Sequence, residues 1–124
     1  MIQFKLSSEQ KLIQESTKEF AQQYNSQGVI DRDQKSTFPK SQIRKLGELG
    51  YMGMMIPSKW GGSELDTISY VIAIEEIAAV ELATSTIMSV NNSLVCQVIN
   101  DFGNEEQKGK YLKSLASGKK LGAY

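Results

Sequence analysis

The chain has 124 residues, of which 40% are hydrophobic and 23% charged, and its 14 basic and 14 acidic side chains cancel. This length suits one domain that buries roughly two thirds of its unfolded surface. No apolar run approaches the roughly 20 residues of a membrane-spanning helix, and the scattered charges form no basic patch for nucleic acid. The absence of His, together with a single Cys, excludes a transition-metal site and a His-based triad.

The first predicted helix covers about residues 8 to 25. Ser7 and Gln10 have the spacing of a capping box, and apolar side chains then recur on one helical face. Alternating apolar residues predict a short extended segment over residues 2 to 6. Residues 26 to 38 contain glycine and a charged stretch, so they are predicted to form an exposed loop.

A second, short helix is predicted to follow this loop. Pro39 suits its first turn, and Gly50 suits the position just after its end. Residues 51 to 66 are rich in Met, Gly and Pro, which predicts an extended crossing and a turn rather than a continuous helix. The paired glycines Gly61 and Gly62 lack the spacing of a phosphate-binding loop.

Two longer helices are predicted in the second half. Asp66 is expected to cap a third helix that reaches about Val80, and Thr84 or Ser85 to begin a fourth helix that ends near Phe102. The expected buried side of the third helix is Tyr70, Val71, Ile74, Ile77 and Ala78.

Asn104 and Gln107 form another capping pair, and Gly118 is the expected stop of a fifth helix. Its expected apolar face is Tyr111, Leu112 and Leu115. Five helices without a sheet predict an all-α, bundle-like domain. The last residues, KKLGAY, begin like an apolar strand and then stop, so we expect a fragment of a longer protein.

Three side chains with possible chemistry are expected to be structural. Cys96 lies in an apolar helical run and is predicted to be a small buried hydrophobe. Glu75 and Glu76 are neighbours on a helix and diverge by about 100°, so they cannot share a proton. One is expected to be solvated and the other to meet a neighbouring helix or subunit.

The run TIMSVNNSLVCQVI, Thr86 to Ile99, interrupts a helix of buried character with two amides. At about 100° per residue, an apolar arc contains Val90, Leu94, Val95, Val98 and Phe102, while Ser89 and Ser93 fall on a polar strip. Asn91 falls inside the apolar arc. Because a buried unpaired amide costs about 1 to 3 kcal/mol, each Asn should have fixed partners. The partners are either backbone groups of a neighbouring loop or helix end, or the surroundings of a ligand cavity.

Several segments occur in an order and spacing that suggest a family. They are FP at 38–39, LGELGYMGMMIP at 46–57, WGGSELD at 60–66, EEIA at 75–78, FGNEEQKGKYL at 102–112 and GKKLGAY at 118–124. In these segments the chain resembles the amino-terminal α-domain of the acyl-CoA dehydrogenases. Within that family, IMSVNNSL at 87–94 looks most like the short-chain, butyryl-CoA type.

The resemblance implies that residues 1–124 are one domain of a larger enzyme, whose middle β-domain and carboxy-terminal α-domain are absent. The parent would use FAD to convert an acyl-CoA to a trans-2-enoyl-CoA and would pass electrons to an electron-transfer flavoprotein. It would usually be a homotetramer. Because the family's catalytic glutamate lies in the carboxy-terminal domain, no catalytic residue is assigned here. The fragment alone is expected to be inactive and not to hold FAD.

The resemblance also implies site residues. The substrate-binding residues would be Thr86, Ile87, Val90 and Leu94, and Tyr124 would contact the cofactor. The expected location is the cytoplasm, or the mitochondrial matrix in a eukaryote, with no membrane or nucleic-acid partner. Two alternatives remain: a non-catalytic helical interaction module, and the equivalent domain of an acyl-CoA oxidase or a flavin monooxygenase.

Overall fold

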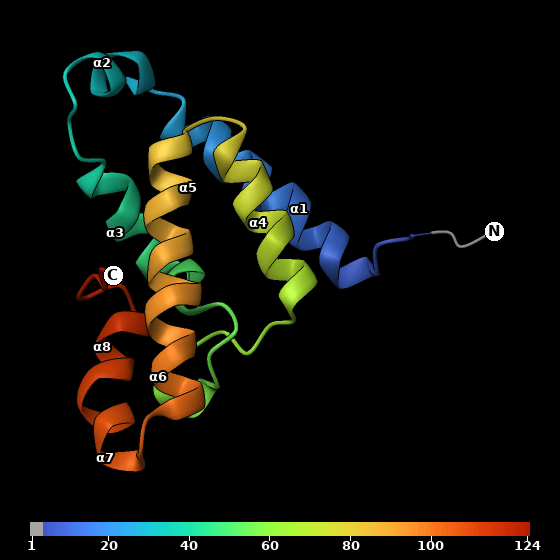
Figure 1. The fold of residues 1–124 in the computed structure, drawn as a ribbon. Helices are drawn as coiled ribbons and strands as arrows, with labels where there is room; N and C mark the ends of the chain where they lie inside the picture. Colours follow the sequence, from blue (N-terminus) through green and yellow to red (C-terminus); the bar gives the residue numbers. More distant parts are fainter. Residues whose placement is uncertain (1–3) are drawn as a thin grey trace.

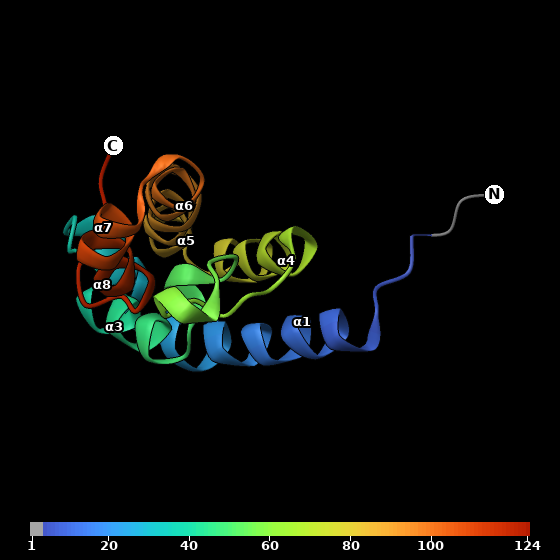
Figure 2. The same ribbon diagram turned by 90° about the horizontal axis from the view of Figure 1, so that it is seen from below.

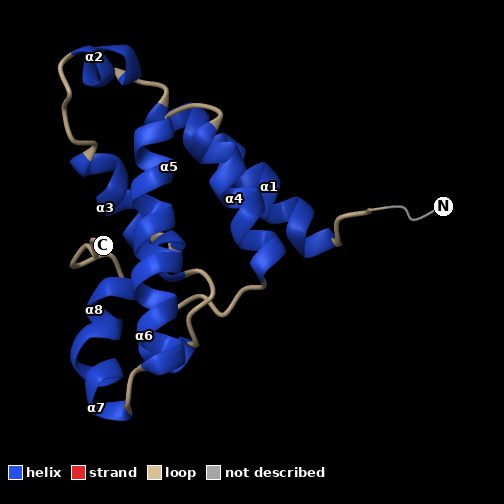
Figure 3. Ribbon diagram, in the orientation of Figure 1, coloured by secondary structure: helices blue, strands red, loops and turns tan. Residues whose placement is uncertain are grey.

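The computed structural model describes residues 4–124, and every regular element in that range is helical (Figure 3). The all-α prediction is therefore confirmed. The α-helices are α1 (Ser8–Phe20), α2 (Val29–Gln34), α3 (Lys40–Glu48), α4 (Thr67–Ala78), α5 (Leu82–Ser89), α6 (Gln97–Phe102), α7 (Glu105–Gln107) and α8 (Lys113–Ala116). The π-helical segments are η1 (Ala21–Asn25), η4 (Val90–Cys96) and η5 (Lys108–Leu112), and the 3-10 turns are η2 (Tyr51–Gly53) and η3 (Ser58–Trp60).

Adjoining segments merge into longer rods. The α1 helix continues into η1, α5 continues through η4 into α6, and α7 continues through η5 into α8. Residues 4–124 thus contain six continuous helices, one more than predicted. The extended segment expected over residues 2 to 6 lies partly outside the described residues.

The rod formed by α5, η4 and α6 is the centre of the fold. The α1 and α4 helices pack on each other along one side of it, and α3, α7 and α8 lie on the other side (Figures 1 and 2). One apolar cluster joins α1, α3, α4 and α5, and a second joins η4 to α8. Met52, Met54 and Met88 are almost fully buried, as expected of flexible core filler.

The predicted helix ends are confirmed where capping chemistry specified them. Gln10 donates its backbone N–H to the Ser7 hydroxyl at 3.1 Å, which begins α1. Asp66 accepts from the backbone N–H of Ser69 at 2.8 Å, and Asn104 begins α7 through its own capping box. Gly50 has φ of 83°, a left-handed conformation that ends a helix with little strain in glycine.

The loop predicted for residues 26 to 38 is wrong, because it contains α2. This helix follows Gly28 and buries none of its own residues. It is held instead by Arg32, whose side chain reaches Glu81 at the start of α5 (2.7 Å). A helix without an apolar face has no hydrophobic periodicity, so the pattern could not indicate it.

The predicted start of the fourth helix is also wrong. The helix begins at Leu82, after an extended Glu81 that separates α5 from α4. Thr84 and Ser85 lie in its first turn, where their hydroxyls donate to Glu81 Oε2 (2.6 Å) and to the Leu82 carbonyl (2.8 Å). The Thr84 hydroxyl thus bonds to the N-cap residue and the Ser85 hydroxyl to the first turn, and neither residue is itself the cap.

Smaller differences concern exposed side chains and the central crossing. Val71 and Tyr111, expected on buried faces, are 52% and 47% exposed. The α4 helix ends at Ala78 rather than near Val80. The segment from 51 to 66 contains no continuous helix, as predicted, but it forms the two short turns η2 and η3 instead of one extended crossing and one turn.

Candidate functional site

The buried face of the central rod carries both of its amides, while part of its apolar arc is exposed. Asn91 and Asn92 are 0% and 1% exposed, beside Met88 and Cys96. Leu94 and Val98, from the predicted apolar arc, are each 47% exposed. Asn91 falls inside the predicted apolar arc and is buried, whereas these two residues of the arc face away from the domain. The side of the rod that faces the core is partly polar, and it can bond to backbone groups of nearby segments.

Each amide bonds mainly to backbone groups, most of them on neighbouring segments. Asn91 Nδ2 donates to the carbonyls of Met52 (2.7 Å) and Leu115 (3.0 Å), and its Oδ1 accepts from the Gly122 N–H (2.9 Å). These bonds confirm that Asn91 has fixed partners and ties its helix to neighbouring backbone. Its side chain is a structural junction.

Asn92 makes an equivalent set of bonds one residue further on. Its Nδ2 donates to the carbonyls of Tyr51 (2.8 Å) and Met88 (2.9 Å), and its Oδ1 accepts from the Met54 N–H (2.7 Å). The irregular crossing at 51 to 54 leaves backbone groups without helical partners, and Asn92 satisfies them. The helical projection missed this burial, because Asn92 falls away from the apolar arc.

An apolar ridge runs along the outward side of the same rod. It repeats every fourth residue and comprises Leu82, Thr86, Val90, Leu94, Val98 and Phe102, which we call the outer ridge. Leu82 is 71% and Phe102 is 84% exposed. A continuous apolar strip of this kind is unusual on a solvent-facing helix and marks a surface suited to an apolar ligand or another protein element.

The predicted substrate residues lie on or beside this ridge. Thr86, Val90 and Leu94 belong to it, and Ile87 lies next to it and is half-buried. The hydroxyl of Thr86 donates to the Leu82 carbonyl at 2.9 Å, so that polar group is already engaged within the helix. All four side chains are thus on one side of one helix.

Thr86 and Ile87 also line a hollow of about 840 Å³, which we call the α2–α5 hollow. Val90 and Leu94 are not part of its wall. Its other walls come from α2, from the segment that leads to α3, and from the turn before α5. The structure therefore divides the four predicted substrate residues between the hollow and the open ridge beyond it.

A buried charged cluster lies where α2 meets the start of α5. Glu81 is 5% exposed and accepts hydrogen bonds from Arg32 Nε (2.7 Å), Asn25 Nδ2 (2.7 Å) and the Thr84 hydroxyl. Burial alone would raise the pKa of Glu81, but the hydrogen bonds and the charge of Arg32 outweigh burial and hold this pKa below its usual value. Sequence reasoning missed this pair, since Arg32 stands in a polar stretch with no local signal of burial.

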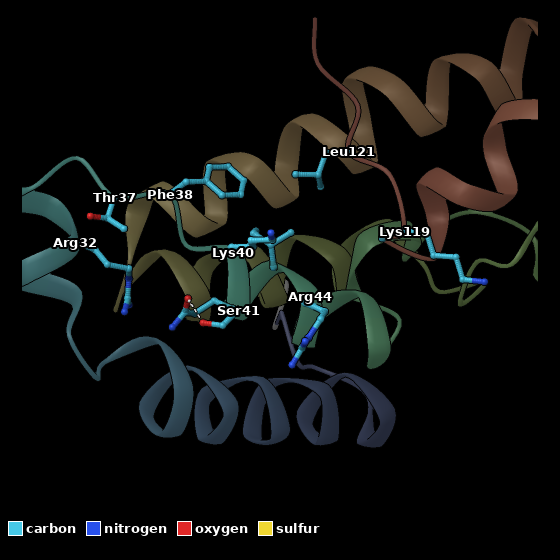
Figure 4. A pocket seen from close by; sticks show the side chains of 11 residues that line it. Arg32, Thr37, Phe38, Lys40, Ser41, Arg44, Lys119 and Leu121 are labelled. Atoms are coloured by element: carbon cyan, nitrogen blue, oxygen red, sulfur yellow. Dashed lines mark hydrogen bonds between the residues drawn. The ribbon is translucent and has the colours of Figure 1, made fainter.

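A second hollow, of about 820 Å³, lies between α3 and residues 118–121. Its lining includes Arg32, Lys40, Arg44 and Lys119 and contains no acidic residue. Figure 4 shows that these cationic ends spread apart, with Lys119 pointing away from Arg44. The charges do not converge on a common point, so the hollow has no defined anion site.

Glu75, Glu76 and Cys96 lie as the sequence predicted. Glu75 is exposed, while Glu76 accepts from Gln14 Nε2 on α1 at 3.1 Å. Cys96 is fully buried, and burial raises the pKa of its thiol to about 12. Within residues 4–124, no cluster of His, Cys, Asp and Glu could hold a metal ion. Over the same residues, no helix is both long and apolar enough to span a bilayer.

Tyr124, the predicted cofactor contact, lies at the end of the chain. Its side chain is fully exposed, and it lines neither hollow. The segment that leads to it is held at Gly122 by Asn91. The role of Tyr124 stays a prediction, as do the roles of the four substrate residues.

Comparison with known proteins defines the family. The sequence profile of the acyl-CoA dehydrogenase N-terminal domain matches residues 7–119. The chain is 40% identical to the short-chain specific acyl-CoA dehydrogenase of Clostridium acetobutylicum, over 98% of this chain and 32% of that protein. The chain belongs to the acyl-CoA dehydrogenase N-terminal domain family, and the predicted family is confirmed.

Solved structures agree with this assignment. The butyryl-CoA dehydrogenase of Megasphaera elsdenii matches with a TM-score of 0.88 at 32% identity, over 97% of this chain and 32% of that one. A chain from the structural study of the electron transferring flavoprotein of Acidaminococcus fermentans matches with a TM-score of 0.92 at 37% identity, over the same shares. The chain spans about a third of the length of these relatives.

Proposed function

We propose that this chain is the N-terminal α-domain of an FAD-dependent short-chain acyl-CoA dehydrogenase and supplies one wall of its acyl pocket. The observation that carries the proposal is the exposed apolar outer ridge on the helix that the family resemblance assigns to the acyl chain. The similarity to a short-chain specific relative supports the choice of a short acyl group.

The wall acts by contact and by exclusion of water. Val90 and Leu94 offer apolar surface, and each buried methylene of an acyl chain gains about 0.8 kcal/mol by leaving water. The hydroxyl of Thr86 is bonded to the Leu82 carbonyl, so it places no unpaired donor against the acyl chain. These residues orient and bind substrate, and none of them transfers a proton.

The cofactor would meet this domain only at an edge. Bound FAD would accept the β-hydrogen of the substrate, which would leave as a hydride. Among the described residues, the one proposed contact is Tyr124, an exposed ring that does not enclose a flavin by itself. We therefore place the flavin-binding groups and the catalytic base in a middle β-domain and a carboxy-terminal α-domain of the parent. The isolated domain would be inactive.

The proposed partners of the parent follow from the same relatives. An electron-transfer flavoprotein would take the electrons, which fits the match to a chain studied with the electron transferring flavoprotein of Acidaminococcus fermentans. The parent would be a homotetramer of the cytoplasm, or of the mitochondrial matrix in a eukaryote.

The test is a chimera. Residues 1–124 are joined to the part of the Clostridium acetobutylicum relative that they do not cover, and bound FAD and bleaching of its absorption are measured. Butyryl-CoA should bleach the flavin faster than octanoyl-CoA. A colourless chimera would refute the enzyme proposal, and a preference for octanoyl-CoA would refute the short-chain assignment.

The wall has its own test in the same chimera. Val90→Trp should weaken binding of longer acyl-CoAs more than of short ones, because the larger side chain shortens the space along the ridge. Val71→Trp is the control, since Val71 is an exposed valine on another helix, α4, whereas Val90 is half-buried. Equal losses at every chain length would place Val90 outside the acyl pocket.

A further inference from the structure

The last segment of the chain, residues 119–124, is fastened to the central rod at Gly122. The Gly122 N–H donates to Asn91 Oδ1 at 2.9 Å. A Cβ added at Gly122 would lie only 2.5 Å from the nearest carbon of Val95. One hydrogen bond and one close approach therefore fix the same residue, and we call the pair the Asn91–Gly122 contact.

The two buried amides divide their partners in an informative way. Asn91 bonds to Met52, Leu115 and Gly122, which belong to η2, α8 and the last segment. Asn92 also makes three backbone bonds, but they reach only the crossing at 51 to 54 and its own helix. Of the two amides, Asn91 alone bonds to the last segment of the chain.

Asn91 also lies next to the proposed acyl contacts on the central rod. Asn91 lies between Val90 and Leu94, two of the proposed acyl contacts. Tyr124, the proposed cofactor contact, follows Gly122 by two residues, and two residues extend at most about 7 Å. The same turn of helix therefore carries the proposed acyl wall and anchors the start of the cofactor edge.

We propose that Asn91 is a positioning residue that sets the cofactor-side segment, residues 122–124, in register with the acyl wall. It acts through the backbone of Gly122 and touches neither substrate nor cofactor. The claim that residues 122–124 lie on the cofactor side rests on the proposed function. The Asn91–Gly122 contact itself does not, because it involves this chain alone. The two parts can be tested separately.

The first experiment measures amide hydrogen exchange by NMR in the 124-residue chain. The Gly122 rate is divided by that of Lys120, whose N–H donates to the Ser114 carbonyl at 3.0 Å and does not depend on Asn91. Asn91→Ala should raise this ratio about tenfold, and the matched control Asn92→Ala should leave it unchanged. An equal change in both variants, or in neither, would overturn the contact's role.

A second pair of variants avoids damage to the core. Gly122→Ala keeps Asn91 but forces the segment away from Val95, so the exchange ratio at position 122 should again rise about tenfold. Gly109→Ala is the control, because its added Cβ meets no atom closer than 3.9 Å. Unchanged exchange at position 122 in Gly122→Ala would refute the close approach.

The second experiment uses the chimera with bound FAD. Asn91→Ala and Gly122→Ala should shift the flavin absorption maximum and weaken FAD binding about tenfold, whereas Asn92→Ala and Gly109→Ala should do neither. Equal flavin loss in Asn91→Ala and Asn92→Ala would show a merely structural role and overturn the inference. If the unmodified chimera holds no FAD, the proposed function and the cofactor part fail together, while the exchange ratios still decide the contact.

Discussion

Removing the positive charge of Arg32 should be the most costly single change at the α2–α5 junction. Arg32→Met keeps the apolar stem but deletes the hydrogen bonds to Glu81, Asn25 and Gln27, each 2.7 Å long. A bond to a buried carboxylate contributes about 1.5 to 3 kcal/mol, and stranding one partner of a buried pair costs about 3 to 5 kcal/mol. Because Arg32 is 14% exposed, we expect the lower end, about 3 kcal/mol.

This loss should depend on pH with a definite sign. The folded pKa of Glu81 lies below its unfolded value of about 4.3, so the ionised carboxylate stabilises the fold above that value. This stabilisation is lost as the pH falls through the folded pKa. In Arg32→Met, burial is no longer opposed by the cation, so the pKa of Glu81 rises. The gap between the two proteins should be largest near pH 7 and shrink below about pH 4.

Urea unfolding followed by circular dichroism measures the effect. With a slope of roughly 1.5 kcal/mol per molar urea, a loss of about 3 kcal/mol lowers the midpoint by about 2 M. Arg44→Met is the control, because the Arg44–Glu48 pair is 3.6 Å long and exposed, and it should cost less than about 0.5 kcal/mol. Adding Glu81→Gln to Arg32→Met should recover about 1 to 2 kcal/mol. A cost equal to that of Arg44→Met, or a gap independent of pH, would refute the reasoning.

Three further outcomes can be measured on the same chain. Gly62→Ala should lower the free energy of unfolding by about 1 to 3 kcal/mol, because the new Cβ would lie 2.0 Å from the Ile56 carbonyl oxygen. Gly109→Ala is in an open helical position and should raise this free energy by about 0.5 to 1 kcal/mol. Urea midpoints that move in the same direction in both variants would contradict this pair. Asn104→Ala should cost about 1 kcal/mol by removing a capping box, and no loss would mean that the box is not stabilising. Cys96 should resist a thiol reagent until the chain unfolds, since it is buried with a pKa of about 12; rapid labelling of the native chain would contradict this burial.

Local chemistry was predictable from the sequence where neighbouring residues decide the structure. Ser7, Asp66 and Asn104 mark helix starts because the capping bond spans only three residues. Gly50 marks a helix end because the left-handed conformation is a property of one residue. These signals marked an end of four of the six helices in residues 4–124.

The α2 helix and the Arg32–Glu81 ion pair were not predicted from the sequence, for one physical reason. The α2 helix is held by Arg32 and Glu81, which lie 49 positions apart, and Arg32 stands in a polar stretch of its own segment. A contact of this range leaves no trace in periodicity. Thr84 is a different case, because it resembles an N-cap but its hydroxyl donates to the buried carboxylate of Glu81, three residues earlier.

The central rod shows why helical phase alone misjudged the candidate site. Apolar periodicity finds a face that avoids water, but it cannot say whether the rest of the domain or something else covers that face. Asn91 and Asn92 turn toward the core because irregular segments end there with unpaired backbone groups, and an amide satisfies donors and acceptors together. Leu94 and Val98 are then left outward. On this argument the exposed part of the apolar arc is the strongest sequence signal for the proposed acyl wall, because the domain itself does not cover it.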